Sequence, residues 1–160
     1  MKLFIIALAL VTSSLSMAAR SGDWVQFNYS RTEGVNQYSG WYTRHVLNQC
    51  DKSYLISEQY HLEGFTDTTF EKVYNESEIL SDAMIQTWLK DCEYNKGSYE
   101  TLTLPTGEMQ TCKVALHDEE NLVEAWAWIG NVPLGIVKQT RSYVDGTSYT
   151  LELFSYNQQK

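Results

Sequence analysis

Apolar and polar residues alternate along most of the chain beyond residue 20. Val25, Phe27 and Tyr29, for example, alternate with Gln26 and Asn28. A period of two is typical of β-strands that bury one face. We therefore expect strands over residues 25–29, 38–47, 54–62, 65–74, 98–104, 109–117, 122–129, 134–144 and 148–156.

One segment has a different period. Apolar residues recur at helical spacing at Ile79, Leu80, Ala83, Met84, Trp88 and Leu89, with polar residues between them. Asn75 with Glu78 three residues later fits a capping box. The pattern predicts one amphipathic helix over residues 76–92. Its apolar stripe should pack on the sheet, because an isolated helix of this length is marginal in water.

Two turn sequences indicate how the strands are joined. Pro105-Thr106-Gly107 should link the strands around it, and Asp145-Gly146 is a strong hairpin signal. The fold class that follows is mainly β (α+β). We expect a highly curved antiparallel sheet or incomplete barrel of about eight to nine strands wrapped around one amphipathic helix, since such a sheet must curl or close to bury a face.

The N-terminus reads as a secretory signal peptide. Lys2 supplies a positive charge, Leu3 to Val11 form a short apolar run, and small residues at Ala18 and Ala19 suit cleavage. A membrane anchor would need ~20 apolar residues. We expect a signal peptide over residues 1–19, a single domain over 20–160, and a periplasmic or secreted protein cleaved near Ala18/Ala19.

Charge and motifs narrow the function further. The 160-residue chain has a formal net charge of −8, which argues against nucleic-acid binding. No later apolar run is long enough for a transmembrane segment, and no catalytic or nucleotide-binding motif occurs. His61 with Glu63, or His117 with Asp118, could act as a general acid–base pair, but such pairs of residues often occur by chance. We expect no enzyme activity, no cofactor and no metal.

Three cysteines remain in the mature chain. Cys92 lies at the end of the expected helix and Cys112 in the hairpin that follows, so we expect a disulfide between them. Cys50 is then the odd thiol, free or bonded to another chain. Two glycosylation sequons, at Asn28 and Asn75, would matter only in a eukaryotic secretory pathway.

The chain is rich in aromatic residues, with five Trp and eleven Tyr. If the helix covers only part of a curved sheet, some of this surface is free to bind an apolar ligand. The candidate lining residues are Val25, Phe27, Tyr29, Tyr42, Trp88, Trp126 and Trp128. The alternative is that these side chains simply fill the core.

Three stretches carry a family resemblance. Residues 99–112 (YETLTLPTGEMQTC), 132–138 (VPLGIVK) and 151–156 (LELFSY) resemble segments of uncharacterised exported bacterial proteins with LolA/LolB-like, lipoprotein-carrier-like open barrels. The resemblance implies the order strands–helix–strands and the binding of acyl chains in the concave face. It supplies no catalytic residue.

Two functional hypotheses follow. The first is a non-catalytic exported protein that binds a lipid-like or other apolar ligand in the concave face, with a cavity beside Trp88 and the strand of Trp126 and Trp128. The second is an envelope protein-interaction or accessory module with a filled core and no ligand, which would present an apolar patch or an unprotected edge strand.

Overall fold

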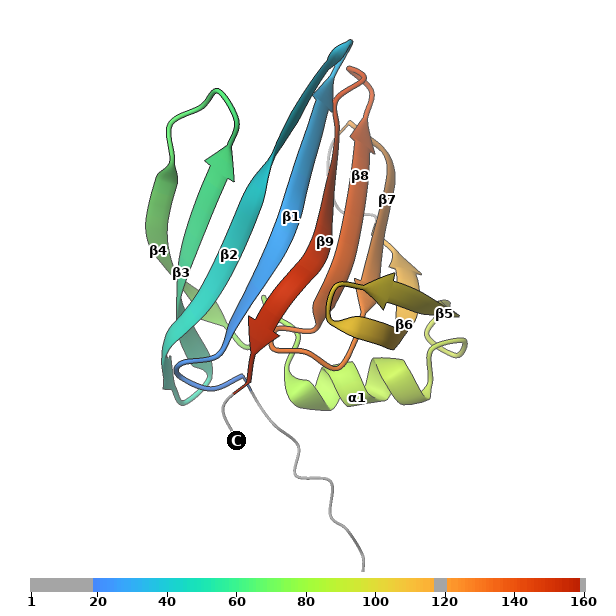
Figure 1. The fold of residues 1–160 in the computed structure, drawn as a ribbon. Helices are drawn as coiled ribbons and strands as arrows, with labels where there is room; N and C mark the ends of the chain where they lie inside the picture. The colour runs from blue at the N-terminus through green and yellow to red at the C-terminus, as the bar shows by residue number, and fades with distance from the viewer. Residues whose placement is uncertain (1–18, 117–120, 159–160) are drawn as a thin grey trace, which may run out of the picture.

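The computed structural model describes residues 19–116 and 121–158. Nine strands and one helix are formed within these residues (Figure 1). In chain order they are β1 (Trp24–Glu33), β2 (Asn36–Cys50), β3 (Ser53–Leu62), β4 (Thr68–Asn75), α1 (Asp82–Lys90), β5 (Ser98–Leu104), β6 (Gly107–Ala115), β7 (Leu122–Ile129), β8 (Ile136–Tyr143) and β9 (Ser148–Asn157).

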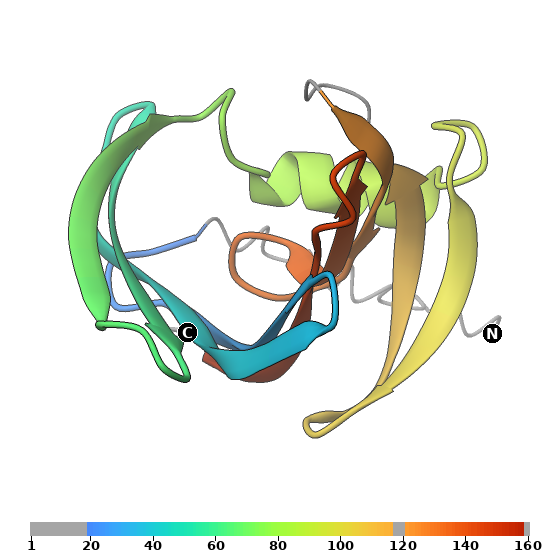
Figure 2. The ribbon, with the colours of Figure 1, turned by 90° about the horizontal axis from the view of Figure 1, so that it is seen from above.

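The strands form one open antiparallel sheet in the order β4-β3-β2-β1-β9-β8-β7-β6-β5. Two meanders, β1 to β4 and β5 to β9, meet where the first strand pairs with the last. The sheet is strongly curved when seen from above, and β4 and β5 are its two edges (Figure 2). The expected fold class, a curved antiparallel sheet with one helix, is confirmed. The sheet does not close into a barrel.

The helix is shorter than its periodicity suggests. Ser81 is the N-cap, and its hydroxyl accepts a hydrogen bond from the Met84 N–H over 3.4 Å. The expected capping interaction does form, because the Asn75 N–H donates to Glu78 Oε2 over 2.8 Å. It closes a turn at the end of β4 instead of starting the helix. The segment between this turn and Ser81 carries Ile79 into the core of the sheet.

The strand expected from residue 134 begins two residues later, at Ile136. Leu134 and Gly135 both adopt left-handed backbone angles, with φ of 62° and 73°. They form a tight loop that packs beneath the helix, where a Cβ on Gly135 would lie 2.7 Å from Cγ1 of Ile85. The loop therefore couples β7 and β8 to α1.

The interior has two core clusters. The larger core cluster comprises Ala19, Val25, Phe27, Tyr42, Val46, Tyr54, Ile56, Ile79, Leu104, Val132, Leu134, Val137 and Leu153. The smaller core cluster comprises Ile85, Cys92, Cys112, Val114, Ala127 and Ile129, and joins α1 to β6 and β7. The curved sheet is thus filled mainly by its own side chains, and the helix covers only the β6–β7 region.

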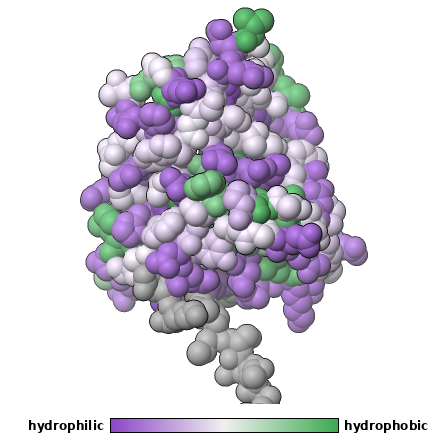
Figure 3. All heavy atoms as spheres, viewed as in Figure 1, coloured by the Kyte–Doolittle hydropathy of each residue, from purple (hydrophilic) through white to green (hydrophobic). Residues whose placement is uncertain are grey.

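The face of the molecule drawn in Figure 3 is mostly hydrophilic or intermediate, with small scattered hydrophobic areas. Within residues 19–116 and 121–158, no helix has both the length and the apolar character needed to cross a membrane.

Candidate functional site

A groove of about 350 Å³ lies beside α1, next to the C-terminal parts of β6 and β7. Its walls are mostly apolar, and two polar residues from the loop after the helix also line it. The lining residues are Leu80, Trp88, Asn95, Lys96, Val114, Ala115, Leu116, Ala127, Ile129 and Ile136. The groove adjoins the smaller core cluster, so its apolar walls continue into the protein interior.

Strand alternation builds one wall of this groove. Val114 pairs with Ala127, and Cys112 pairs with Ile129, so these side chains share one face of β6 and β7. Because Cys112 is bonded to Cys92 after the helix, that face must be the one toward α1. Ala127 leaves a space on this wall that a larger side chain would fill.

The opposite wall comes from the helix. Ile85 is buried against β6 and β7, and Trp88, one turn later in the sequence, is half-buried at the groove. Side chains three residues apart lie on the same side of a helix. Trp88 therefore borders both the packed cluster and the open volume.

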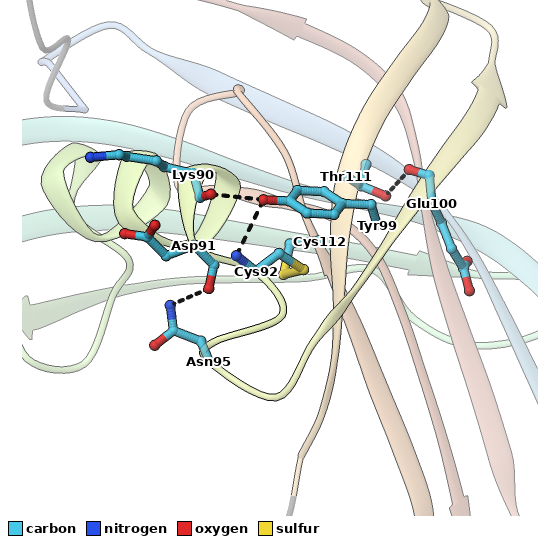
Figure 4. The surroundings of a disulfide bond; sticks show 8 residues. All are labelled: Lys90, Asp91, Cys92, Asn95, Tyr99, Glu100, Thr111 and Cys112. Atoms are coloured by element: carbon cyan, nitrogen blue, oxygen red, sulfur yellow. Dashed lines mark hydrogen bonds between the residues drawn. A yellow bond between two sulfur atoms is a disulfide. The ribbon is translucent and has the colours of Figure 1, made fainter.

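The disulfide between Cys92 and Cys112 holds this arrangement in place (Figure 4). The two Cα atoms are 5.6 Å apart. The Tyr99 hydroxyl donates to the Lys90 carbonyl over 2.8 Å and accepts from the Cys92 N–H over 3.4 Å. The end of α1 is thus fixed to β5 and β6, and the predicted disulfide is confirmed. Cys50 is a free, exposed thiol.

One cationic residue lines the groove. Lys96 lines it, is exposed, and adopts a left-handed backbone angle with φ of 63°. Its neighbour Asn95 donates from Nδ2 to the Asp91 carbonyl over 3.0 Å, which ties the loop to the helix end. Apolar walls with an ammonium group beside them suit a molecule with an apolar tail and an acidic head.

The seven candidate lining residues are not brought together. Of these, Trp88 lines the groove, whereas Val25, Phe27 and Tyr42 belong to the larger core cluster. Tyr29 packs against that cluster. Phe27 stacks on Tyr42 with ring centroids 5.9 Å apart, so this part of the concave face is filled by the sheet itself.

Trp126 and Trp128 lie on the face of β7 that points away from α1. The ammonium of Lys113 lies 4.6 Å from the Trp126 ring centroid and 5.0 Å from that of Trp128. Their indole N–H groups donate to Glu124 and Glu100, each over 2.6 Å. On this face of β7, both Trp side chains are therefore held by cation–π contacts and by hydrogen bonds to carboxylates.

A buried polar cluster occupies the concave face near β4. Glu58 is 3% exposed and accepts hydrogen bonds from the hydroxyls of Tyr60 and Tyr74. Its Oε1 is 3.3 Å from Nε of Arg44. Burial, followed by the hydrogen bond to Glu58, raises the pKa of Tyr74 to about 12. Burial also raises the pKa of Tyr42, on the neighbouring strand, far above its ordinary value.

Of the two possible acid–base pairs, one lies at the surface and the other falls outside the described residues. Nδ1 of His61 lies 2.7 Å from Oδ1 of Asp67 at the surface, and Glu63 lines a shallow hollow nearby. His117 and Asp118 lie outside the described residues. Among the residues that are described, no group of three or more His, Cys, Asp or Glu side chains could hold a metal ion.

No protein-family model matches this chain, and no curated protein matches it. Among solved structures, the chain is similar to a crystal structure of MucB, with 10% identity and a TM-score of 0.44 over 89% of this chain and 55% of that one. It is also similar to the complex structure of Pseudomonas aeruginosa MucA/MucB, with 8% identity and a TM-score of 0.44 over 87% of this chain and 52% of that one. The chain therefore spans about half the length of the solved structures it matches.

Proposed function

We propose that this protein is an exported, non-catalytic binding protein whose groove beside α1 holds an amphiphile with an alkyl tail and an acidic head group. The observation that carries the proposal is the apolar groove itself, which is lined by Trp88, Ile129 and the cationic Lys96. Its volume of about 350 Å³ falls at the lower end of the ~300–1,000 Å³ range common for small-molecule sites.

The physical basis of binding is burial of an alkyl chain against apolar walls. Each Å² of apolar surface removed from water contributes roughly 25 cal/mol before entropic costs. The disulfide fixes the wall formed by β6 relative to α1, so less ordering is needed when a ligand binds. A charge-assisted contact with Lys96 would select a carboxylate over an alcohol.

Export is part of the proposal. The leader has the charge and apolar run of a signal peptide. The disulfide between Cys92 and Cys112 fits an oxidising compartment, because cytosolic thiols are usually kept reduced. Periplasmic or secreted location is therefore the location that the chemistry of this chain favours.

Titration with decanoate and decanol, followed by Trp fluorescence and calorimetry, tests the groove. The wild-type protein should bind decanoate more tightly than decanol. Leu116→Glu places a carboxylate in the groove and should abolish binding, whereas Val123→Glu adds the same charge at an exposed position outside it and should not. Absence of saturable binding of both compounds to wild type would refute the proposal.

Lys96→Asn tests the head-group contact separately. Asn tolerates left-handed backbone angles better than most residues, so the variant should keep the loop conformation at φ of 63°. It should weaken decanoate binding and leave decanol binding unchanged. Equal losses for the two compounds would assign Lys96 a structural role only.

A second candidate function is protein binding along β4. This edge strand is exposed at every position except Tyr74, and the apolar side chains of Phe70 and Val73 are 41% and 60% exposed. An exposed edge strand can accept an extended segment of another protein by adding a strand to the sheet. These features favour the interaction module as the alternative.

Site-specific crosslinking from β4 in an envelope extract tests this alternative. Phe70→Lys and Val73→Lys should each remove a crosslinked species that wild type forms. Val144→Lys is the control, because Val144 is 72% exposed in the turn between β8 and β9, away from β4. A crosslinked species that survives both β4 variants would exclude β4 as the docking edge.

A further inference from the structure

A second hollow, of about 320 Å³, lies on the opposite face of the sheet from the core. It spans β9, β1, β2 and β3, and its lining includes Gln26, Asn28, Trp41, His61 and Phe154. Trp41 pairs with Asn28 on one side and with His61 on the other, so these three side chains share the outer face. The next residue, Tyr42, points to the core.

One wall of the hollow is a pair of stacked rings. The Trp41 and His61 rings are nearly parallel, at 16°, with centroids 5.7 Å apart. Nδ1 of His61 is 2.7 Å from Oδ1 of Asp67, which fixes the orientation of the imidazole. Gly40 allows close approach of β2 and β3 here, since a Cβ would lie 1.8 Å from the His61 carbonyl oxygen.

The other aromatic side of the hollow is the ring of Phe154, which lies at a β-bulge. The register between β1 and β9 shifts between Gln26 and Phe27, which pair with Ser155 and Leu153. Phe154 is the extra residue, and its side chain is 46% exposed at the hollow. Bulges often redirect a side chain beside a functional site. Phe154 follows the buried Leu153, so strand alternation directs its side chain outward, and the bulge places Ser155 on the same outer face, opposite Gln26.

Planar amides form the floor between the two walls. Gln26 is half-buried, and its Oε1 accepts a hydrogen bond from the Ser155 hydroxyl over 3.2 Å, which orients the amide group. Asn28 is exposed beside it. Each amide offers both donors and acceptors. The hollow therefore combines aromatic faces with groups that can bond to hydroxyls.

We propose that this hollow binds a neutral saccharide. The C–H face of a sugar ring is apolar and packs on an aromatic ring, while its hydroxyl groups both donate and accept, as amides do. Glu63 at the rim and the net charge of −8 disfavour an acidic sugar. The inference is independent of the alkyl groove, because the two sites lie on opposite faces of the sheet.

Saturation-transfer NMR and calorimetry on the full mature protein test the proposal, with maltotriose, cellotriose and triacetylchitotriose as probes. The protein should be made in a bacterial host, so that the sequon at Asn28 is not glycosylated. At least one trisaccharide should bind wild type. Trp41→Ala should weaken that binding on the order of tenfold, as expected for loss of an aromatic contact.

Matched variants separate the site from general effects. Trp126→Ala removes a Trp from β7, outside the hollow, and should leave saccharide binding unchanged. Gln26→Ala should weaken saccharide binding without changing decanoate binding. Lack of binding of all three saccharides to wild type, or equal losses in the Trp41 and Trp126 variants, would overturn the inference whatever the outcome at the alkyl groove.

Discussion

The indole N–H of Trp128 on β7 donates to Oε2 of Glu100 on β5 over 2.6 Å, although β6 lies between these strands. Nζ of Lys113 on β6 is 3.4 Å from Oε1 of the same carboxylate. The three side chains therefore tie the edge strand β5 to the interior of the sheet. The hydrogen bond from Trp128, together with Lys113, lowers the pKa of Glu100 from its ordinary value of 4.5.

This relationship predicts a pH-dependent stability. A carboxyl whose pKa is lowered by folding stabilises the native state above its unfolded pKa, and this contribution is lost as pH falls through the lower folded pKa. Trp128→Phe should therefore be less stable than wild type at neutral pH. The difference in free energy of unfolding between the two proteins should become smaller as pH falls below 4.5. Urea unfolding across this pH range measures it, and Glu100→Gln should make this difference insensitive to pH.

The disulfide should contribute most of the stability of the α1 region. Cys92 and Cys112 are 20 residues apart, and closing a loop of this size stabilises by about 3 kcal/mol in the chain-entropy model. Reduction, or the double substitution Cys92→Ser/Cys112→Ser, should lower the free energy of unfolding by this order. Cys50→Ser should not, since Cys50 is exposed and free. Urea denaturation with and without reductant compares the three proteins.

Gly97 lies close to the disulfide and also to the backbone of β6, because an added Cβ would lie 2.9 Å from the Lys113 carbonyl oxygen. An added Cβ would lie 2.6 Å from Sγ of Cys112 and 2.8 Å from Sγ of Cys92. Gly97→Ala should therefore destabilise the oxidised protein by roughly 1–3 kcal/mol, the usual cost of overpacking. The same substitution should cost less in the Cys92→Ser/Cys112→Ser background. Equal costs in both backgrounds would assign the effect to the backbone.

Removing the Glu58 side chain should destabilise the folded protein. Glu58 is 3% exposed and faces Arg44, so truncation leaves a partly buried guanidinium without its counter-charge. Glu58→Ala should lower the free energy of unfolding by roughly 3 kcal/mol. Glu58→Gln keeps the shape and one of the two oxygens that accept from the Tyr60 and Tyr74 hydroxyls, and it should cost less. Thermal unfolding of both variants at neutral pH makes the comparison.

The mature chain should begin at Ala19. Ala19 is 3% exposed and belongs to the larger core cluster, so removing it with the leader would leave a gap in the core. The adjacent Arg20 N–H donates to Oδ2 of Asp23, a fully buried residue, over 2.7 Å. A new ammonium group on Ala19 would lie close to that carboxylate. Intact-mass measurement of the exported protein would identify the first residue, and a chain starting at Arg20 would contradict this prediction.

Local signals predicted the elements well. Alternation located every strand, because side chains on a half-buried sheet must follow a period of two. The helix was predicted too long because Asn75 and Glu78 form a capping pair that closes a turn, and only tertiary contacts place Ile79 in the sheet core. The positive φ of Leu134 had no signal in the sequence beyond the neighbouring Gly135.

The groove was harder to predict because large aromatic side chains were taken as its lining. The predicted disulfide was a better guide to the lining residues than the aromatic side chains were. If Cys112 faces the helix, alternation places Val114 on the same side, and pairing adds Ala127 and Ile129. Trp126 and Trp128 then face away. Ala127 contributes a small side chain to this wall, and composition alone does not reveal that position.

The pairing of β1 with β9 has a consequence for biogenesis. These strands come from opposite ends of the chain and lie in the middle of the sheet, so the two meanders can join only after the whole polypeptide has been delivered. Contacts between such distant segments form slowly. For the exported protein that we propose, a secretion channel that threads the chain from its N-terminus would receive an incompletely folded molecule, and the two meanders would pair on the far side of the membrane.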